Sequence, residues 1–455
     1  MSTGQRSRGS RGEEGAEEKR GGGAAVNETA SVIVPSTNQS EDALNTSAHL
    51  LVRSSAPPLL STSAPPLLSS SAPQLLAPQL LSPSAPPLLS SSAPLPVSES
   101  PRRNLWLFSA RTDLSVFLGS AVVSLVALWI GARAGVLYGD APDWAWVPAV
   151  LLIDVAHVWS TSFRVYLDKD ELQRRPWLYT LVPVLGLAIG VALYSEGELV
   201  FWRVLAYLAV FHFIRQQYGW VALYRARAGE REALGKCIDA VAVYSATLYP
   251  LIYWHTHLPR KFWWFLANDF THVPAMIERI AAPLYWLALG VYASKSLYGW
   301  LVKREGNPGK DIVIVTTAVC WYVGIIGFNS DYAFTVTNVV IHGVPYFALI
   351  YWYSRTRMKQ TGGRGVYRIF AHGPAIFLVS LWAIAYIEEM FWDRGVWQDR
   401  SWLFGSPWEI GALKLILVPL LALPQLVHYV LDGFIWRRKN NPDFAFVEAQ
   451  DVKMG

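Results

Sequence analysis

The chain has 455 residues, of which 52% are hydrophobic and 16% are charged. Soluble domains carry about 25% charged residues, so this composition excludes an ordinary soluble domain and is typical of a membrane protein. The formal net charge is +5, but the basic residues lie in short clusters between apolar segments. This pattern favours cytoplasmic loops over a nucleic-acid-binding surface, and we expect no nucleic-acid partner.

The first part of the chain, residues 1–103, differs in composition from everything after it. A charged, glycine-rich start is followed by a Ser/Thr/Asn stretch and then by copies of SAPPLLS that begin at Ser55, Ser63 and Ser84. Proline lacks a backbone N–H donor and favours the extended polyproline II conformation. We therefore predict a disordered, low-complexity N-terminal arm.

From Asp113 onward, ten apolar segments have the length of a membrane-spanning helix. They cover residues 114–138, 144–166, 177–194, 200–224, 237–256, 282–302, 312–328, 333–353, 366–388 and 410–436. The predicted fold is an all-α, polytopic integral membrane bundle of about ten transmembrane helices. It occupies residues 104–437, and residues 438–455 form a short cytoplasmic tail.

The charges in the connections predict the orientation of these helices. Basic residues follow the second, fourth, sixth, eighth and tenth segments, whereas most other connections are acidic, short or mixed. By the positive-inside rule we expect a multi-pass protein of the inner (plasma) membrane, surrounded by lipids, with both termini in the cytoplasm. The fifth connection departs from the pattern, because Arg260, Lys261 and the aromatic run 262–265 predict an interfacial helix outside.

The second segment carries five polar residues along one predicted helical face. Asp154, His157, Thr161, Arg164 and Asp168 follow one another at i, i+3, i+7, i+10 and i+14. A charged residue near the bilayer centre costs roughly 2.5–3.5 kcal/mol, so such a face normally points into the protein. We expect the first three residues to belong to a site and the last two to lie at its cytoplasmic rim.

Four histidines are predicted to lie at the same depth. His157, His212, His342 and His428 occur in the second, fourth, eighth and tenth segments, which all run in the same direction. Each lies 9 to 13 residues before the cytoplasmic flank of its segment, which corresponds to a depth of roughly 14–20 Å at 1.5 Å per residue. Four helices thus bring one imidazole each to one layer, and we predict that these are metal ligands.

Three charged residues accompany the histidines. Asp154, Arg215 and Asp432 would together cost on the order of 8–10 kcal/mol if left unpaired in lipid, against a typical net stability of about 5–15 kcal/mol. We therefore expect Arg215 to pair with Asp154 or Asp432, or the group to bind an ion or line water. The two carboxylates are candidate orienting or proton-accepting groups, and Arg215 is a candidate counter-charge or anion anchor.

Other acidic and histidine residues are weaker candidates. His255 and His257 at the outer end of the fifth segment, with Asp269 and His272, could form an external metal site, although this histidine pattern at a helix end is more typical of a surface. The neighbouring Glu388 and Glu389 lie at an outer helix end, and we expect at most one of them to face the core.

Imidazole ligands suit iron, copper or zinc, and iron with open positions activates dioxygen. A site within the membrane indicates an apolar substrate, so the sequence predicts a metal-dependent oxidoreductase, most simply an iron enzyme, acting on a lipid or isoprenoid. Copper, zinc or a single bis-histidine haem stays open. No HxxxH, HxxHH or ExxH pair is present, which sets the chain apart from the fatty-acid desaturase and hydroxylase class.

The histidines stand singly in DVAHVWSTSFRVYLD, FHFIRQQYGW, VIHGVPYF and HYVLDGFIW. This plan of one histidine per helix resembles the bacterial carotene dioxygenases that form retinal, and the resemblance covers the architecture without carrying over any catalytic residue. It implies an oxygenase acting on an isoprenoid. The alternative is a proton-coupled transporter in which the same residues relay protons or hold a substrate headgroup, although the chain lacks an evident inverted repeat. A membrane scaffold would leave the polar layer unexplained.

Overall fold

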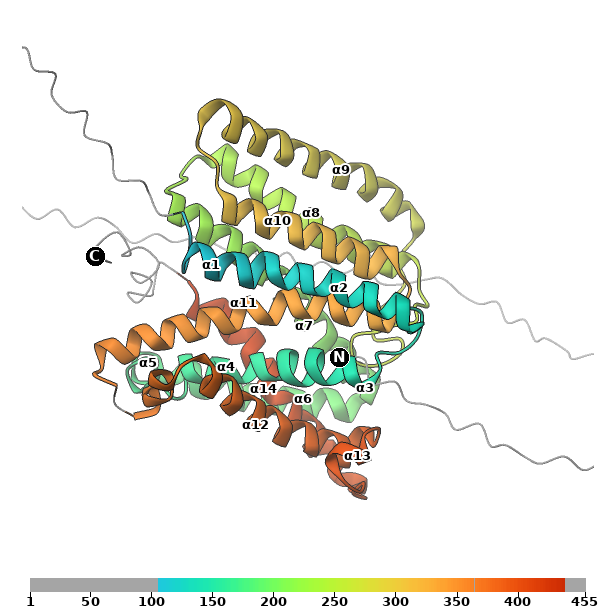
Figure 1. The fold of residues 1–455 in the computed structure, drawn as a ribbon. Helices are drawn as coiled ribbons and strands as arrows, with labels where there is room; N and C mark the ends of the chain where they lie inside the picture. The colour runs from blue at the N-terminus through green and yellow to red at the C-terminus, as the bar shows by residue number, and fades with distance from the viewer. Residues whose placement is uncertain (1–104, 364, 438–455) are drawn as a thin grey trace, which may run out of the picture. The chain divides into compact units, whose positions relative to one another are not determined.

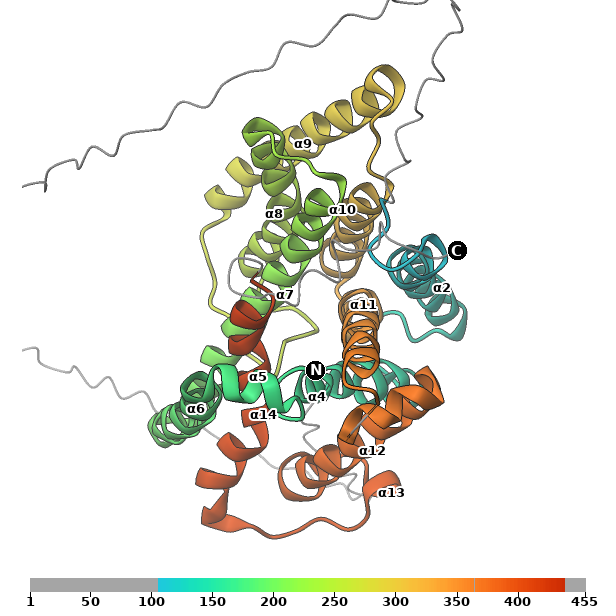
Figure 2. The same ribbon diagram turned by 90° about the vertical axis from the view of Figure 1, so that its left-hand side faces the viewer.

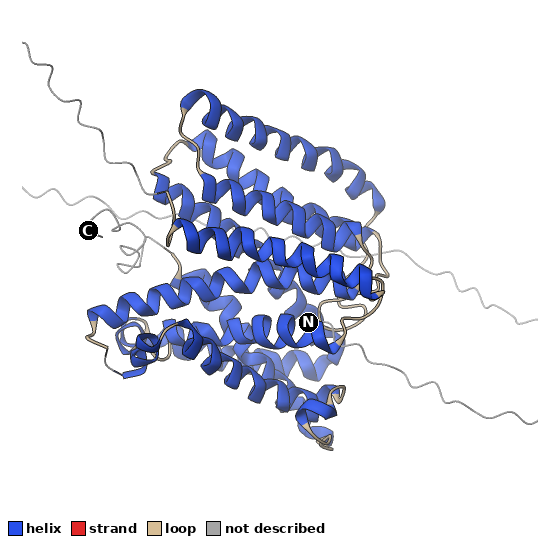
Figure 3. Ribbon diagram, in the orientation of Figure 1, coloured by secondary structure: helices blue, strands red, loops and turns tan. Residues whose placement is uncertain are grey.

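The computed structural model describes residues 105–363 and 365–437 (Figure 1). In this part of the chain every regular element is a helix, and Figure 3 shows no strand. The all-α prediction is therefore confirmed for the described residues. The predicted N-terminal arm, 1–103, and the predicted tail, 438–455, lie outside them.

The longer helices follow one another with short connections. In chain order they are α2 (Gly119–Ala134), α4 (Ala156–Arg164), α6 (Pro176–Glu196), α7 (Glu198–Ala228), α8 (Ala233–Thr256), α9 (Ala275–Tyr298), α10 (Pro308–Trp321), α11 (Asp331–Gln360), α12 (Pro374–Trp392) and α14 (Lys414–Ile435). The short helices are α1 (Ala110–Asp113), α3 (Asp143–Trp146), α5 (Lys169–Arg174), α13 (Ser401–Phe404), and the 3₁₀ turns η5 (Gly365–His372) and η7 (Gly411–Leu413). π-Helical segments extend several helices: η1 (Leu114–Leu118), η2 (Val147–Val155), η3 (Gly299–Lys303), η4 (Tyr322–Gly327) and η6 (Asp393–Trp397).

Local sequence explains several of these limits. The side chain of Ser330 accepts a hydrogen bond from the Ala333 N–H and caps α11, and Asn307 caps α10 in the same way through the Lys310 N–H. Helix α7 ends at Ala228 and is capped by Gly229, whose φ of 70° lies in the left-handed region that glycine adopts without strain.

Seven helical stretches among the described residues are long and apolar enough to cross a membrane, so the chain is a multi-pass membrane protein. They are Ala110–Ala134, Asp143–Arg164, Pro176–Glu196, Pro308–Gly327, Asp331–Gln360, Pro374–Trp397 and Gly411–Ile435. The predicted count of about ten is not confirmed. The other three predicted spans do form helices, α7, α8 and α9, but they are not among the seven.

Helix α11 is the centre of the bundle. In Figure 2 it lies between α10 and α2 on one side and α4 and α12 on the other, and it contacts α2, η2, α4 and α10. In its most apolar stretch 83% of the residues are buried, compared with 17% in the peripheral α6. A polar residue on α11 therefore meets other helices rather than lipid.

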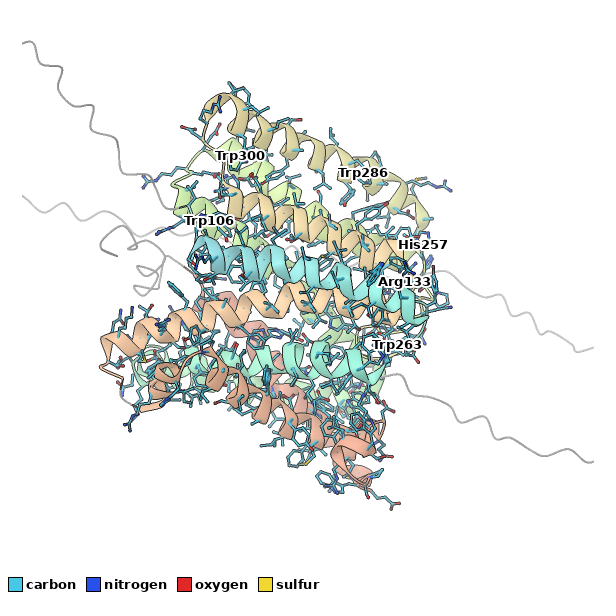
Figure 4. All side chains as sticks on the ribbon, viewed as in Figure 1. Trp106, Arg133, His257, Trp263, Trp286 and Trp300 are labelled. Atoms are coloured by element: carbon cyan, nitrogen blue, oxygen red, sulfur yellow. The ribbon has the colours of Figure 1, made fainter. Side chains whose placement is uncertain are left out.

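The outer helices expose large apolar side chains. Val123 and Trp129 on α2, Leu185 on α6, and Trp286 and Leu287 on α9 are each more than half exposed, which in water would be unfavourable and in lipid is expected. Figure 4 shows Trp106 and Trp300 near one end of the helices and Trp263 near the other. Tryptophan at both ends is typical of the two membrane interfaces.

The connection between α8 and α9 corrects one prediction. Residues 258–274 form an irregular loop and not an interfacial helix, because its aromatic side chains, including Phe262 and Trp264, are buried in the core. The loop is held by Asp269, whose Oδ2 accepts hydrogen bonds of 2.8 Å from the backbone N–H groups of Trp264 and Phe265. Burial raises the pKa of Asp269 to about 6, although these hydrogen bonds act to lower it.

Candidate metal centre

The four predicted histidines converge on one point inside the bundle. His157 comes from α4, His212 from α7, His342 from α11 and His428 from α14, and one ring nitrogen of each lies within 4.8 Å of those of the other three. None of the four side chains is more than 4% exposed. The prediction that these histidines share one layer is confirmed.

The imidazoles face one another through their Nε2 atoms. The Nε2 atoms of His342 and His157 are 3.1 Å apart, and those of His428 and His212 are also 3.1 Å apart. Two nitrogens bound to one ion at 2.0–2.1 Å lie about 2.9–3.4 Å apart when adjacent and about 4.2 Å apart when opposite. The bound of 4.8 Å within which all four nitrogens lie is about 0.6 Å wider than the separation of opposite ligands, so the imidazoles would have to move inwards by roughly 0.3 Å each to bind one ion. The donor set therefore fits a single metal ion.

Close helix packing brings the rings together. A Cβ atom at Gly343 would lie 2.6 Å from the side chain of Ile153 and 3.6 Å from the Cβ of His157, so only glycine lets α4 and η2 approach α11 this closely here. The imidazole of His342 stacks on the ring of Phe213, with centroids 3.5 Å apart and planes 8° apart. Both contacts fix the orientation of ligands that sit on different helices.

A chain of hydrogen bonds sets the tautomer of His428. Tyr346 donates its hydroxyl proton to Asp432 Oδ1 over 2.6 Å, so the 2.8 Å contact between Tyr346 and Thr161 must use the Thr161 proton. The Thr161 oxygen is then free to accept from His428 Nδ1 at 2.7 Å. His428 accordingly carries its proton on Nδ1 and turns the Nε2 lone pair towards the centre, as a metal ligand requires.

Two carboxylates lie just beyond the histidines. Asp154 Oδ1 is 3.6 Å from His157 Nδ1, and Asp432 oxygens are 3.9 Å from the Nδ1 atoms of both His212 and His428. Within the described part of the chain, His157 Nδ1 and Asp154 Oδ1 have no hydrogen-bond partner. The structure thus brings both predicted carboxylates to the outer side of the imidazoles, where they would balance the charge of a bound cation.

Arg215 is not part of this centre, which corrects the expected ion pair with Asp154 or Asp432. Its side chain is exposed, donates a hydrogen bond to the Tyr244 hydroxyl and lies over the ring of Tyr218 with a cation–π distance of 5.1 Å. Arg215 follows His212 by three residues on α7, so the two side chains point about 60° apart. This difference is enough to leave the arginine on the outer surface of the helix.

The polar face of the second segment is buried along its whole length, from Asp154 to Asp168. Arg164 pairs with Glu171 at 2.9 Å, and Asp168 accepts hydrogen bonds from Tyr353 at 2.8 Å and from Arg357 at 3.0 Å. Burial acts to raise the pKa of Asp168, but the hydrogen bonds from arginine and tyrosine outweigh it and hold the pKa below its usual value. Arg164 and Asp168 therefore belong to an ionic cluster beside the metal centre and not to the centre itself.

Two weaker candidates have a different environment from the one expected. His255 Nδ1 contacts the Leu251 carbonyl at 2.6 Å. In the described chain, His255, His257, Asp269 and His272 are not brought together as a metal-binding group, whereas the four buried histidines are. The expectation that one of Glu388 and Glu389 faces away from the core is wrong, because both side chains are buried.

Sequence reasoning missed two contributors, Phe213 and Tyr346. Tyr346 follows His342 by four residues, one helical turn, and this spacing was a signal that it lies on the same face. Phe213 directly follows His212 and stacks on a histidine of another helix, a contact that no spacing within one helix reveals.

We compared the chain with protein-family models, with curated proteins and with solved structures, and none of them matches. The geometry of the centre is therefore the basis of the functional proposal.

Proposed function

We propose that this protein is a membrane metalloenzyme, an oxygenase-like oxidoreductase whose resident ion is held by His157, His212, His342 and His428. The observation that carries the proposal is the convergence of four buried imidazoles, one of which has its tautomer fixed by Thr161. The facing imidazoles can share a proton in each 3.1 Å Nε2–Nε2 pair, and a cation between them would take the place of these protons and bind all four nitrogens. Imidazole sets of this kind suit iron, copper and zinc.

We propose a redox-active ion, because reaction with dioxygen requires iron or copper and not zinc. Of the two we propose iron. When bound, the ion would supply activation of dioxygen. The protein's own residues would hold and orient the ligands: Thr161 and Tyr346 fix His428, while Asp154 and Asp432 offset positive charge. Tyr346 and Asp432 also form a hydrogen-bonded pair in which a proton can be held beside the imidazoles.

The substrate class follows from the surroundings of the centre. The histidines are buried in a membrane bundle whose outer helices expose apolar side chains, so a lipid or isoprenoid reaches it more readily than a polar metabolite does. We further propose that α7, α8 and α9 also cross the bilayer, which gives about ten spans in the inner (plasma) membrane with both termini in the cytoplasm.

Metal analysis of the purified protein, combined with dioxygen uptake, tests this function. We expect about one iron atom per chain, its loss in His157→Ala, and dioxygen consumption that depends on added isoprenoid or lipid. His255→Ala is the matched control, because this histidine lies in a helix outside the centre, and it should retain the metal.

The same experiment addresses transport, the alternative function. A protein that binds no metal under any growth condition, yet accumulates a solute in vesicles along a proton gradient, would contradict the enzyme and support the transporter. A bound metal without dioxygen consumption would leave the four-histidine centre in place and reject the oxygenase chemistry.

A further inference from the structure

A cavity lies beside the metal centre, at the end of α12 that carries Glu388 and Glu389. Its walls include four tryptophans and two polar residues, and it admits a water-sized body. These six residues are Trp146, Trp202, Trp392, Trp397, Glu389 and Gln425. They come from α3, α7, α12, η6 and α14, and Val150 of η2 also lines the cavity, so six helical elements meet there.

The cavity adjoins the four-histidine centre along two helices. Gln425 precedes His428 by three residues on α14, and Val150, which also lines the cavity, precedes Asp154 by four residues on η2. At about 1.5 Å of rise per residue, each separation is roughly one turn, or 4.5–6 Å. The cavity therefore lies next to the metal centre on the side away from Asp432.

Several polar atoms at the cavity lack hydrogen-bond partners. In the described part of the chain this holds for Gln425 Oε1 and for the indole nitrogens of Trp146 and Trp202, although each of these side chains is more than nine-tenths buried. Buried polar groups without a partner are costly and normally contact a bound solvent molecule or ion. The cavity is thus equipped for a hydrated occupant.

Three buried carboxylates lead from the cavity to the histidines. Glu389 lines the cavity, and the adjacent Glu388 accepts hydrogen bonds from the indoles of Trp159 and Trp392. Trp159, which donates to Glu388, lies two residues after His157 on α4, and Asp154 Oδ1 is 3.6 Å from His157 Nδ1. Glu389 and Glu388 on α12 and Asp154 on η2 thus belong to two elements that contact each other, one of which lines the cavity through Val150.

We propose that the cavity and the carboxylates of Glu389, Glu388 and Asp154 form the route by which a divalent metal ion is loaded into the four-histidine centre. This inference rests on the proposed function, because it presupposes the ion. A site whose ligands are at most 4% exposed needs a path along which water ligands are replaced in steps, and carboxylate oxygens and the Gln425 amide oxygen are hard donors suited to that exchange.

The charged residues beside the cavity leave Glu389 accessible to a cation. Arg400 lies with its guanidinium 3.8 Å from the centroid of the Trp146 ring and is paired with Asp143 at 3.1 Å, so the cation beside the cavity has an acidic partner that does not line the cavity. The carboxylate of Glu389 receives no hydrogen bond from the described residues. Its oxygens are therefore available to a cation, which would displace the carboxyl proton as it binds.

Kinetics of metal uptake test the route separately from the site. Metal-free protein in detergent is mixed with Co²⁺, and bound cobalt is followed by its visible absorption. We expect Glu389→Gln to slow uptake by at least about tenfold, and to slow release to a chelator equally, while the final cobalt content and the dissociation constant stay unchanged. Glu409→Gln, which alters an exposed carboxylate in the connection before α14, is the control and should load at the wild-type rate.

The possible failures are distinguishable. If Glu389→Gln and Glu388→Gln both load at the wild-type rate and to the wild-type content, the route is wrong and the metal centre stands. If slowing is confined to Asp432→Asn, the ion enters from the opposite side of the histidines, which also rejects the route. If the wild-type protein binds no cobalt, iron, copper or zinc, the proposed function falls and the route falls with it.

Discussion

Two buried polar clusters of this bundle differ in how their side chains are partnered. The first is the Asp239 cluster, a set of ion pairs that joins α7, α8, α9 and α10. In it, Asp239 lies between Lys295, at 2.6 Å, and Lys310, at 3.2 Å, and it also contacts Arg225. Lys310 further pairs with Glu230 at 2.6 Å. Every charge in this cluster has an opposite charge from another part of the chain.

The second group is the four-histidine centre, where like groups face each other. Nε2 meets Nε2 at 3.1 Å in two pairs, and Arg215, the cation nearest in sequence to His212, points outwards. A polar cluster completed by its own opposite charges holds the architecture together, whereas four converging imidazole nitrogens form a set of donors that could hold a metal ion. The two clusters should therefore respond differently to mutation.

Removing the carboxylate at the centre of the Asp239 cluster should give the largest effect on stability. Asp239→Ala leaves three buried or half-buried cations without their common partner, and breaking a buried ion pair costs about 3–5 kcal/mol. The free energy of unfolding in detergent should fall by that amount, while the metal content of the protein that remains folded is unchanged. Loss of metal without loss of stability would contradict the division between the two clusters.

A smaller effect, on metal affinity and not on folding, is expected for Thr161→Val. Without the hydroxyl, His428 Nδ1 loses its 2.7 Å partner and its tautomer is no longer fixed, and such changes beyond the ligands cost about 10- to 100-fold in metal affinity. Competition with a chelator measures this loss. Ser160→Ala is the control, because the Ser160 hydroxyl donates its hydrogen bond to the backbone carbonyl of His157 and not to an imidazole. Equal affinities for both variants would show that the hydrogen-bond chain does not orient the ligand.

The smallest effect is a pH dependence of stability at Asp168. The folded-state pKa of this carboxyl lies below its ordinary value of 3.8, so its stabilising contribution is present above pH 3.8 and is lost as the pH falls through the folded-state pKa. Asp168→Asn should cost about 1.5 kcal/mol at neutral pH, the lower end for hydrogen bonds to charged groups, because Arg357 keeps its contact with Asp170. Thermal unfolding from pH 7 down to pH 3 measures the difference between variant and wild type. A difference that grows towards low pH would contradict the assignment.

The sequence was informative about the site where polar residues are rare. Histidines stand out in apolar segments, and counting residues from the charged flanks was enough to predict that His157, His212, His342 and His428 meet. The same reasoning found the buried face from Asp154 to Asp168, since the cost of a charge in lipid leaves few alternatives.

The errors have a common physical origin, which is the rotation of a helix about its axis. Periodicity places Arg215 near His212, but a rotation of about 60° decides between core and surface. At Glu388 and Glu389, adjacent side chains can both be buried because neighbouring elements cover both sides of α12. The count of about ten spans is not confirmed for a different reason: α7 is a long helix whose arginines and histidine reduce its apolar character.

X-ray absorption spectroscopy at the metal edge of the purified protein tests the central claim most directly. The four-histidine centre predicts an ion with nitrogen ligands at about 2.0–2.1 Å and with the outer scattering of imidazole rings, and His342→Ala should lower the imidazole contribution. A metal surrounded by oxygen or sulfur ligands, or a spectrum that His342→Ala leaves unchanged, would contradict the account.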